Sequence, residues 1–514
     1  MPPRRPTFRP LRIRTLSLEE LACSALFTFF AMQGAIPGIA PAQSLEMTGS
    51  APTGLTTIGG IASQAIANSL ILALILRRPR FLLRQISQVP WLILPALLAT
   101  LAIASTVWSL DPLLTLRRSV PFALAGLFGL WFAARYSPAR QFAILRFAMM
   151  ALALATVALV VLAPSLGLDH TPGHASDWQG VFTQKNACGR IMVLATAIIL
   201  YGERRSLLRP SRLATLALFI FVLIMSGSRG AWMIEAALLF LWLLLALARH
   251  AGQRIRLVLA VAAPPFSIAL GAILVLRVHD LAPLLGRDPT LTGRTAIWAH
   301  VTRFVFQRPL LGYGYDAFWR GMQGPSFQVA AAVHFVVAHA HNGFLEITLE
   351  LGSAGLLLFV LSWLRGWGKL WPLWQRGAID RIAWPLALLV LIVLYNLDEN
   401  TLLIYNGLFW ILYVAALTST EISAEPALSE SAQHRGPQHA RGWRDGVERA
   451  SRTEPALSES AQRASRTEPA LSESAQRASR TGDHRHTNRP RPHEILNPQS
   501  ETAPQFAQPV QEFP

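Results

Sequence analysis

Long apolar runs dominate this chain of 514 residues and limit it to folds that can cross a bilayer. Four of the longest runs cover 213–225, 231–247, 257–276 and 344–364. A helix needs about 20 apolar residues to cross roughly 30 Å of hydrocarbon, where only helices and closed barrels satisfy every backbone polar group. Because 52% of the residues are hydrophobic and only 15% are charged, we predict an all-α integral membrane protein.

The complete set of apolar runs predicts a polytopic bundle of about twelve transmembrane helices. They are expected at 19–39, 55–76, 89–107, 120–134, 142–163, 188–202, 213–226, 230–248, 257–276, 343–364, 382–397 and 404–419. Lys and Arg concentrate in the cytoplasmic loops of membrane proteins. With the N-terminus inside, 22 Lys and Arg fall in the predicted cytoplasmic segments, and the opposite loops at 40–54 and 398–403 have none. An even number of spans then places both termini in the cytoplasm.

Three domains follow from this pattern. We expect a cytoplasmic arm over 1–18, a membrane domain over 19–420 and a cytoplasmic tail over 421–514, with a periplasmic loop domain at about 277–342 between the ninth and tenth helices. No small-residue cleavage site follows the basic first residues, so the first helix is predicted to be retained. The tail repeats a 14-residue unit with few apolar residues, which predicts disorder.

The formal charge of +17 does not indicate a nucleic-acid partner. The tail contains 12 Arg against 13 acidic residues, so the basic excess lies in the membrane domain, where it reports topology. The two cysteines, Cys23 and Cys188, lie within or beside apolar runs and are predicted to be packing residues without a disulfide.

Polar residues concentrate at the start of one predicted span, His339-Ala340-His341-Asn342-Gly343-Phe344-Leu345-Glu346. Polar groups at the edge of hydrocarbon cost several kcal/mol unless they are paired, so such a cluster predicts a functional site. Four other polar segments lie between apolar runs, at 177–186, 226–230, 292–298 and 309–318.

Together these segments resemble the bacterial O-antigen ligase-like membrane proteins, which include O-antigen ligases and exopolysaccharide polymerases. The family's motifs occur here in order: Ser228-Arg229-Gly230, Gly293-Arg294 with Trp298, the Pro-Leu-x-Gly-x-Gly loop from Pro309, and His341-Asn342-Gly343 followed by Gly352 and Gly355. The resemblance covers about 90–415. The segment 178–186 and the stretch 399–410 look most like exopolysaccharide polymerases. The chain departs from the family at 398–400, where Asp-Glu-Asn stands in place of an expected Glu-Ser.

The resemblance implies transfer of a growing glycan from an undecaprenyl diphosphate carrier to an acceptor hydroxyl, with inversion, at the periplasmic face of the bacterial inner membrane. It implies no metal, cofactor or nucleotide sugar, and other polysaccharide export proteins are possible partners. Polymerisation of exopolysaccharide repeat units is the leading prediction, and ligation of O-antigen to lipid A-core is the alternative. A transporter or flippase of lipid-linked oligosaccharide is an alternative of another class, although no repeat of one half by the other is evident.

The residues themselves are suited to this chemistry. We predict His341 as the general base, because an unperturbed imidazole titrates near pH 6.5. Arg229 and Arg294 are predicted to bind the diphosphate through their guanidinium forks, with Lys185 as a further contact. A purely structural role is the alternative for each of these residues: His341 as a helix cap, Arg229 and Lys185 as interfacial anchors, and Arg294 as a solvated loop residue.

Supporting roles are predicted for a second group of residues. Glu346 is expected to orient the base or to pair with Arg294, and Asn342 to help a helix N-terminus orient a phosphate. Tyr313 and Tyr315 are candidates for stacking on sugar rings. The supporting group also includes Trp178 and His339. No metal site is predicted, because no Cys or further His completes a ligand set with His334, His339 and His341.

Overall fold

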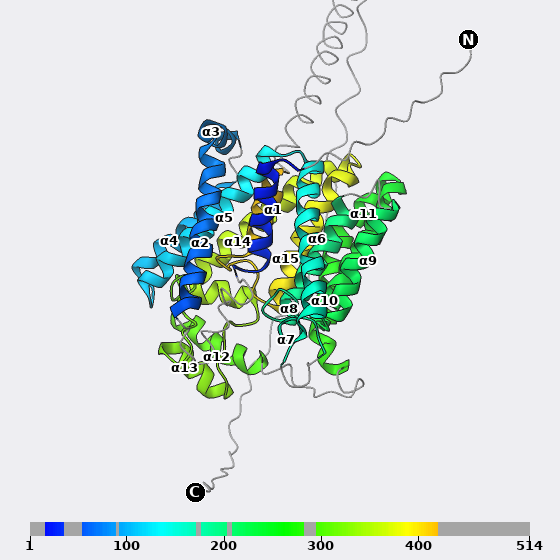
Figure 1. Ribbon diagram of the computed structural model, residues 1–514. Helices are drawn as coiled ribbons and strands as arrows, with labels where there is room; N and C mark the ends of the chain where they lie inside the picture. The colour runs from blue at the N-terminus through cyan, green and yellow to red at the C-terminus, as the bar shows by residue number, and fades with distance from the viewer. Residues whose placement is uncertain are drawn as a thin grey trace, which may run out of the picture. The chain divides into compact units, whose positions relative to one another are not determined.

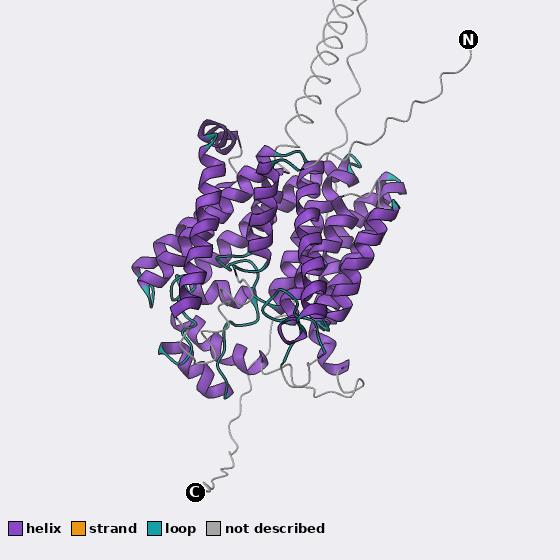
Figure 2. Ribbon diagram, viewed as in Figure 1, coloured by secondary structure: helices purple, strands orange, loops and turns teal. Residues whose placement is uncertain are grey.

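The computed structural model describes residues 16–34, 54–88, 92–170, 176–202, 208–281 and 294–419, all within one compact unit. All the regular secondary structure in these residues is helical, apart from one isolated bridge between Leu168 and Trp178 (Figures 1 and 2). The predicted all-α fold class is therefore confirmed. The predicted tail over 421–514, its repeats and the first 15 residues of the predicted arm lie outside the described residues.

A helix is found at each of the twelve predicted positions. These helices are α1 (Leu18–Ala31), α2 (Gly54–Leu76), α4 (Ile93–Ala104) with η3 (Ser105–Val107), α5 (Pro112–Arg135), α6 (Pro138–Leu162), α8 (Lys185–Ala197) with η4 (Ile198–Gly202), α9 (Pro210–Met225), α10 (Arg229–His250), α11 (Gln253–Leu281), α14 (Gly343–Gln375), α15 (Ile379–Asp398) and Leu408–Ser419. Seven of them, α2, α5, α6, α10, α11, α14 and α15, are long and apolar enough to cross a membrane. The count of twelve spans stays a prediction, because the others are shorter.

Helix α15 is the most buried of the seven long apolar helices. In its most apolar window 78% of the residues are buried, and it packs against α10, α11 and α14. A helix that is apolar on all sides is expected at such a central position. The two acidic residues at its C-terminal end, Asp398 and Glu399, are therefore surrounded by protein.

Four shorter helices complete the described part: α3 (Pro79–Gln88), α7 (Pro164–Gly167), α12 (Arg294–Gln307) and α13 (Gly324–Val333). Helices α12 and α13 lie between α11 and α14, in the segment predicted to be a periplasmic loop domain, and the periplasmic location stays a prediction. They lie at the end of the bundle where α8 and α10 begin (Figure 1). Apolar residues of these two helices and of the loop between them form a second small core, with Ile297, Val301, Phe304, Tyr313, Phe318 and Val329 among its members.

The loop that begins at Pro309 packs against a kink in α14 at Gly352, so two motifs that lie apart in the sequence meet in the structure. Gly352 has φ 65°, a left-handed conformation, and a Cβ there would lie 2.2 Å from the backbone of Leu310. The loop uses the backbone groups that the kink releases. Ser353 N–H donates to Pro309 O at 2.7 Å, and Tyr313 N–H donates to Leu349 O at 3.0 Å. The loop and the kinked helix therefore satisfy each other's backbone.

Candidate functional site

Four segments distant in sequence converge at one end of the bundle. They are the C-terminal end of α15, the loop before α14, the first turn of α12 and the start of α8. The residues that meet are Asn186, Arg190, Arg294, His339, His341, Asp398 and Glu399. Ionisable groups beside an apolar bundle are rare and usually functional, so this cluster is the candidate active site.

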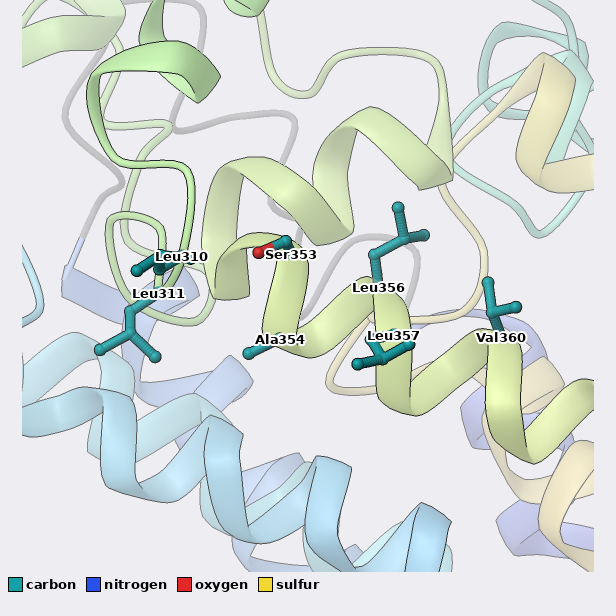
Figure 3. A pocket seen from close by; sticks show the side chains of 7 residues that line it. All are labelled: Leu310, Leu311, Ser353, Ala354, Leu356, Leu357 and Val360. Carbon is teal, nitrogen blue, oxygen red and sulfur yellow. The ribbon is translucent and has the colours of Figure 1, made fainter.

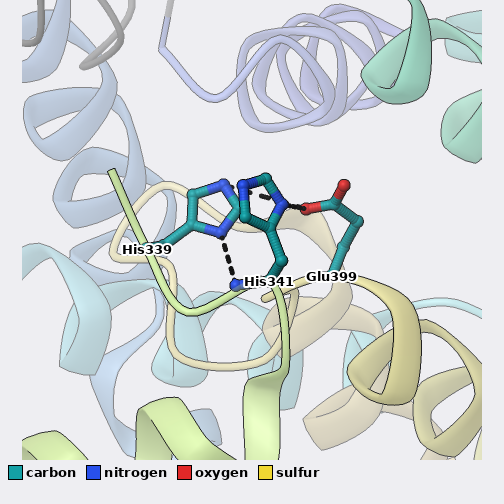
Figure 4. A group of neighbouring side chains, drawn as sticks. All are labelled: His339, His341 and Glu399. Carbon is teal, nitrogen blue, oxygen red and sulfur yellow. Dashed lines mark hydrogen bonds and ion pairs between the residues drawn. The ribbon is translucent and has the colours of Figure 1, made fainter. Parts of the chain in front are cut away.

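His341 and Glu399 form its central pair (Figure 4). The imidazole Nδ1 lies 3.0 Å from Glu399 Oε2, and His339 Nε2 lies 3.8 Å from the same oxygen. The two imidazole rings are 4.1 Å apart between centroids. The Glu399 side chain is only 4% exposed, whereas that of His341 is 27% exposed. The pair therefore has a buried acid and an accessible imidazole.

The charge state of Glu399 decides what His341 can do. Burial raises the pKa of this carboxyl, but the hydrogen bond with His341 and the positive charge of Arg294 outweigh burial and hold its pKa well below its usual range. Glu399 is therefore an anion at neutral pH. A carboxylate facing Nδ1 favours the tautomer with the proton on Nδ1, which leaves the lone pair of Nε2 free to accept a proton.

His339 is held neutral beside this pair. Burial, followed by the charge of His341, lowers the pKa of His339 to about 3. Its Nδ1 accepts the backbone N–H of His341 at 3.2 Å, which requires that nitrogen to be unprotonated. His339 therefore supports the loop and is poorly suited to accept a second proton.

The backbone of His341 is strained. Its φ of 48° lies in the left-handed region, which costs a residue with a Cβ roughly 1–3 kcal/mol. Such strain persists only where the surrounding structure holds it, and it is common at active sites. Asn342 follows as the N-cap of α14, where its Oδ1 accepts from Phe344 N–H at 3.0 Å and from Leu345 N–H at 3.1 Å. Asn342 thus caps the helix, and its predicted role toward a phosphate stays untested.

Arg294 is held by two acidic residues. Its Nη1 lies 2.7 Å from both the carbonyl and the Oδ1 of Asp398, and its Nη2 lies 3.0 Å from Glu399 Oε1. Its guanidinium is therefore engaged by protein oxygens, and it orients the carboxylate that faces His341. Its role as a diphosphate ligand stays a prediction.

Lys185 is also paired, with its Nζ 2.7 Å from Asp177 Oδ2. Arg229, in contrast, makes no side-chain hydrogen bond or ion pair with any described residue. It begins α10 between two residues that touch the site. Ser228 Oγ lies 3.1 Å from Asn186 Oδ1, and a Cβ on Gly230 would lie 2.4 Å from Asp398 Oδ2. Of the three predicted phosphate ligands, Arg229 is the one whose charge no carboxylate balances within the described part of the chain.

The structure places the predicted supporting residues differently from the expectation. Glu346 does not pair with Arg294 or His341; it accepts from the Trp319 indole and from Ala340 N–H. Tyr313 and Tyr315 are buried in the protein, where Tyr315 is fully enclosed and its ring packs on Phe122, so neither ring is placed to stack on a sugar.

Trp178 is half-buried, and its ring meets Phe221 of α9 edge to face. Both cysteines are buried and unpaired, as predicted.

Ligand atoms of His339, His341 and Glu399 lie within 4.8 Å of one another, a set that sequence reasoning did not assemble. These donor types suit a divalent cation. A cation there would, however, share the Glu399 carboxylate with the guanidinium of Arg294. The metal-independent site stays a prediction.

Sequence reasoning missed Asn186, Arg190, Asp398 and Glu399 as site residues. The segment 398–400 was the point at which the chain departs from the expected family pattern, and it proves to hold the central acid. One signal was available. Arg190 lies within an apolar run and Asp398 ends another, and ionisable groups in such positions need partners.

An apolar cavity of about 650 Å³ lies farther along α14, past the kink (Figure 3). It is lined by Leu310, Leu311, Ser353, Ala354, Leu356, Leu357 and Val360. Several of these side chains are exposed, Leu310 to 70% and Leu357 to 57%. Apolar side chains exposed in this way suit contact with hydrocarbon.

These features define the class of the protein: a polytopic helical membrane protein with a polar site at the ends of its helices. Residues 214–360 match the family model described as O-antigen ligase, so the chain carries an O-antigen ligase family domain. The match includes Arg229, Arg294 and His341.

Two relatives extend this result. The chain is 29% identical over 197 residues to the exopolysaccharide production protein ExoQ of Rhizobium meliloti, which covers 35% of this chain and 44% of the relative. It is 30% identical over 170 residues to the O-antigen ligase of Pseudomonas aeruginosa, covering 33% and 37%. The matches thus span less than half the length of these relatives.

Proposed function

We propose that the protein is a glycan polymerase that joins repeat units carried on undecaprenyl diphosphate during exopolysaccharide biosynthesis. The observation that carries the proposal is the His341–Glu399 pair, 3.0 Å apart, with Arg229, a cation without an acidic partner among the described residues, at the edge of the same cluster. The O-antigen ligase family domain and the similarity to the exopolysaccharide protein ExoQ support the same chemistry. The site would face the periplasm of a bacterial inner membrane.

In the proposed reaction, an acceptor hydroxyl attacks the anomeric carbon of the lipid-linked glycan. His341 Nε2 takes the hydroxyl proton while the new carbon–oxygen bond forms. The bond between the anomeric carbon and the phosphate oxygen breaks, and its electron pair leaves with the diphosphate. Glu399 stabilises the imidazolium that results, and the proton then passes to water. A single displacement of this kind inverts the anomeric configuration.

The diphosphate gains charge as it leaves, so a nearby cation stabilises the transition state. Arg229 suits this role because its guanidinium can bind two phosphate oxygens at once and has no acidic partner among the described residues. The apolar cavity along α14 is suited to the isoprenoid tail of the carrier, because its lining is almost entirely hydrocarbon.

Ligation of finished O-antigen to lipid A-core is the second candidate, and the similarity to the O-antigen ligase of Pseudomonas aeruginosa favours it. The two reactions share a donor and differ in the hydroxyl that attacks. Deleting the gene and comparing secreted polysaccharide, lipopolysaccharide and lipid-linked glycans on gels separates them. Loss of secreted polymer with intact lipopolysaccharide supports the polymerase. Loss of O-antigen from lipid A-core supports the ligase, and no change in either contradicts both.

Arg229→Ala is expected to raise the KM for the lipid-linked donor and to lower kcat, because the variant removes the charge that meets the diphosphate. Loss of one charge-assisted contact of about 1.5–3 kcal/mol corresponds to roughly a 10- to 100-fold fall in kcat/KM. Arg229→Lys should recover only part of this, because an ammonium lacks the planar fork. Transfer by the purified protein in detergent measures both constants. Arg209→Ala, an exposed arginine at the opposite end of α9, serves as the control. Equal KM values for Arg229→Ala and the control would show that Arg229 is only an anchor.

A further inference from the structure

The residue that precedes the proposed base, Ala340, is held through both of its backbone polar groups. Ala340 is fully buried, and its N–H donates to Glu346 Oε2 at 2.7 Å. Its carbonyl accepts the indole N–H of Trp298 at 2.8 Å. Glu346 and Trp298 make no hydrogen bond or ion pair with His341 or Glu399, which are described residues, and the proposed reaction makes no use of them.

His341 therefore lies between two fixed points. On one side is the held Ala340 peptide, and on the other is Asn342, whose side chain caps α14. His341 itself adopts the strained φ of 48°. Relaxation of this residue to an ordinary negative φ would rotate its Cα–Cβ bond and move the imidazole away from Glu399.

Helix α12 contacts Glu399 directly and His341 through the neighbouring residue Ala340. Arg294 and Trp298 are four residues apart and so lie on the same face of this helix. Arg294 binds the Glu399 carboxylate, and Trp298 binds the carbonyl next to His341. One rigid turn therefore determines where the acid and the imidazole lie relative to each other.

We propose that Trp298, together with Glu346, is a positioning residue that keeps His341 in its strained conformation and its ring against Glu399. This inference rests on the proposed function, because it assigns a role toward the same base. Glu346 suits the task because a carboxylate can accept two N–H groups, those of Ala340 and Trp319, whereas a glutamine offers one acceptor oxygen.

The test compares two tryptophan variants that lose the same kind of bond. Trp298→Phe keeps an aromatic ring but loses the hydrogen bond to Ala340. Trp363→Phe, the control, loses an indole N–H bond of 3.1 Å to the carbonyl of Leu389 in another part of the bundle. Because a displacement near 1 Å at a reacting group can cost about 100-fold, Trp298→Phe should lower kcat about 10- to 100-fold with little change in donor KM. Trp363→Phe should stay within about twofold, well below the effect of one misplaced group.

A double variant asks whether the effect passes through the His341–Glu399 pair. If Trp298 acts by placing the imidazole against Glu399, then Trp298→Phe should cost much less in a Glu399→Gln background, because residues that share one function are not additive. An equal fold-change in both backgrounds would overturn the proposal. So would a Trp298→Phe enzyme with the wild-type kcat.

Glu346→Gln provides a second variant in case Trp298→Phe does not fold. It should lower kcat in the same way while donor KM stays near that of the wild type, and an unchanged kcat would contradict the proposed role. Failure of the proposed function gives a different result. An active His341→Ala enzyme would remove His341 as the base, whereas an inactive one with a fully active Trp298→Phe enzyme would overturn only the positioning role.

Discussion

His341→Ala is expected to abolish polymer formation while folded protein remains in the membrane. A positioned general base contributes about 100- to 10,000-fold to a rate, and no other described side chain is placed to replace it. His339 does not substitute, because its pKa is lowered to about 3 and its Nδ1 is engaged by the backbone of His341. Purified protein, lipid-linked donor and a gel or mass-spectrometric readout of chain length measure the loss.

His300→Ala is the matched control for this variant. His300 lies on α12, and within the described part of the chain its ring makes one hydrogen bond, to the carbonyl of Ala296 in the same helix. It should retain wild-type polymer length and yield. Wild-type polymer from the His341→Ala enzyme would show that the hydroxyl loses its proton to another group, and the role assigned to His341 would be wrong.

Arg294→Ala is expected to destabilise the protein and to inactivate it. The substitution leaves Asp398 and Glu399 buried without their guanidinium, and removal of one partner from a buried ion pair costs about 3–5 kcal/mol. The Glu399 carboxylate would also lose the contact that orients it toward His341. A lower Tm in detergent and a lower kcat should therefore appear together.

Two further variants separate this role from direct binding of the diphosphate. Arg303→Ala, an exposed arginine on the same helix, should leave both the Tm and the activity unchanged. Adding Glu399→Gln to Arg294→Ala should restore part of the lost Tm, because it removes one unpaired buried charge. An Arg294→Ala protein with a wild-type Tm but a raised donor KM would instead identify Arg294 as a phosphate ligand.

Much of the architecture was predictable because membrane crossing depends on local composition. A run of apolar residues forms a helix wherever it lies in hydrocarbon, since no other segment can satisfy its backbone. The predicted positions therefore coincide with helices, even though several of those helices are too short to count as spans on length alone. The tight turn at 226–230 was also predictable, because glycine is favoured where the backbone turns sharply. Gly227 has a φ of 61°, and a Cβ there would lie 2.3 Å from Asp177 Oδ1.

The contacts within the site were less predictable, because they join residues far apart in the chain. The sequence places His341 in a polar cluster, but it does not show that Glu399, 58 residues later, provides its carboxylate. Glu346 was the nearer candidate along the helix, and it binds a backbone N–H instead. The Tyr313 and Tyr315 rings likewise lie in a loop by sequence but are buried by tertiary packing.

The sequence by itself therefore determined the all-α class, the positions of the helices and the inclusion of His341 and Arg294 in the polar cluster. These properties depend on hydropathy and on side-chain chemistry, which are local. Only the tertiary structure decided which charges are compensated: Arg294 by Asp398 and Glu399, Lys185 by Asp177, and Arg229 by no described residue. The reason is physical, because electrostatic pairing depends on distance in space and on burial, and both are determined by how α8, α10, α12 and α15 pack together.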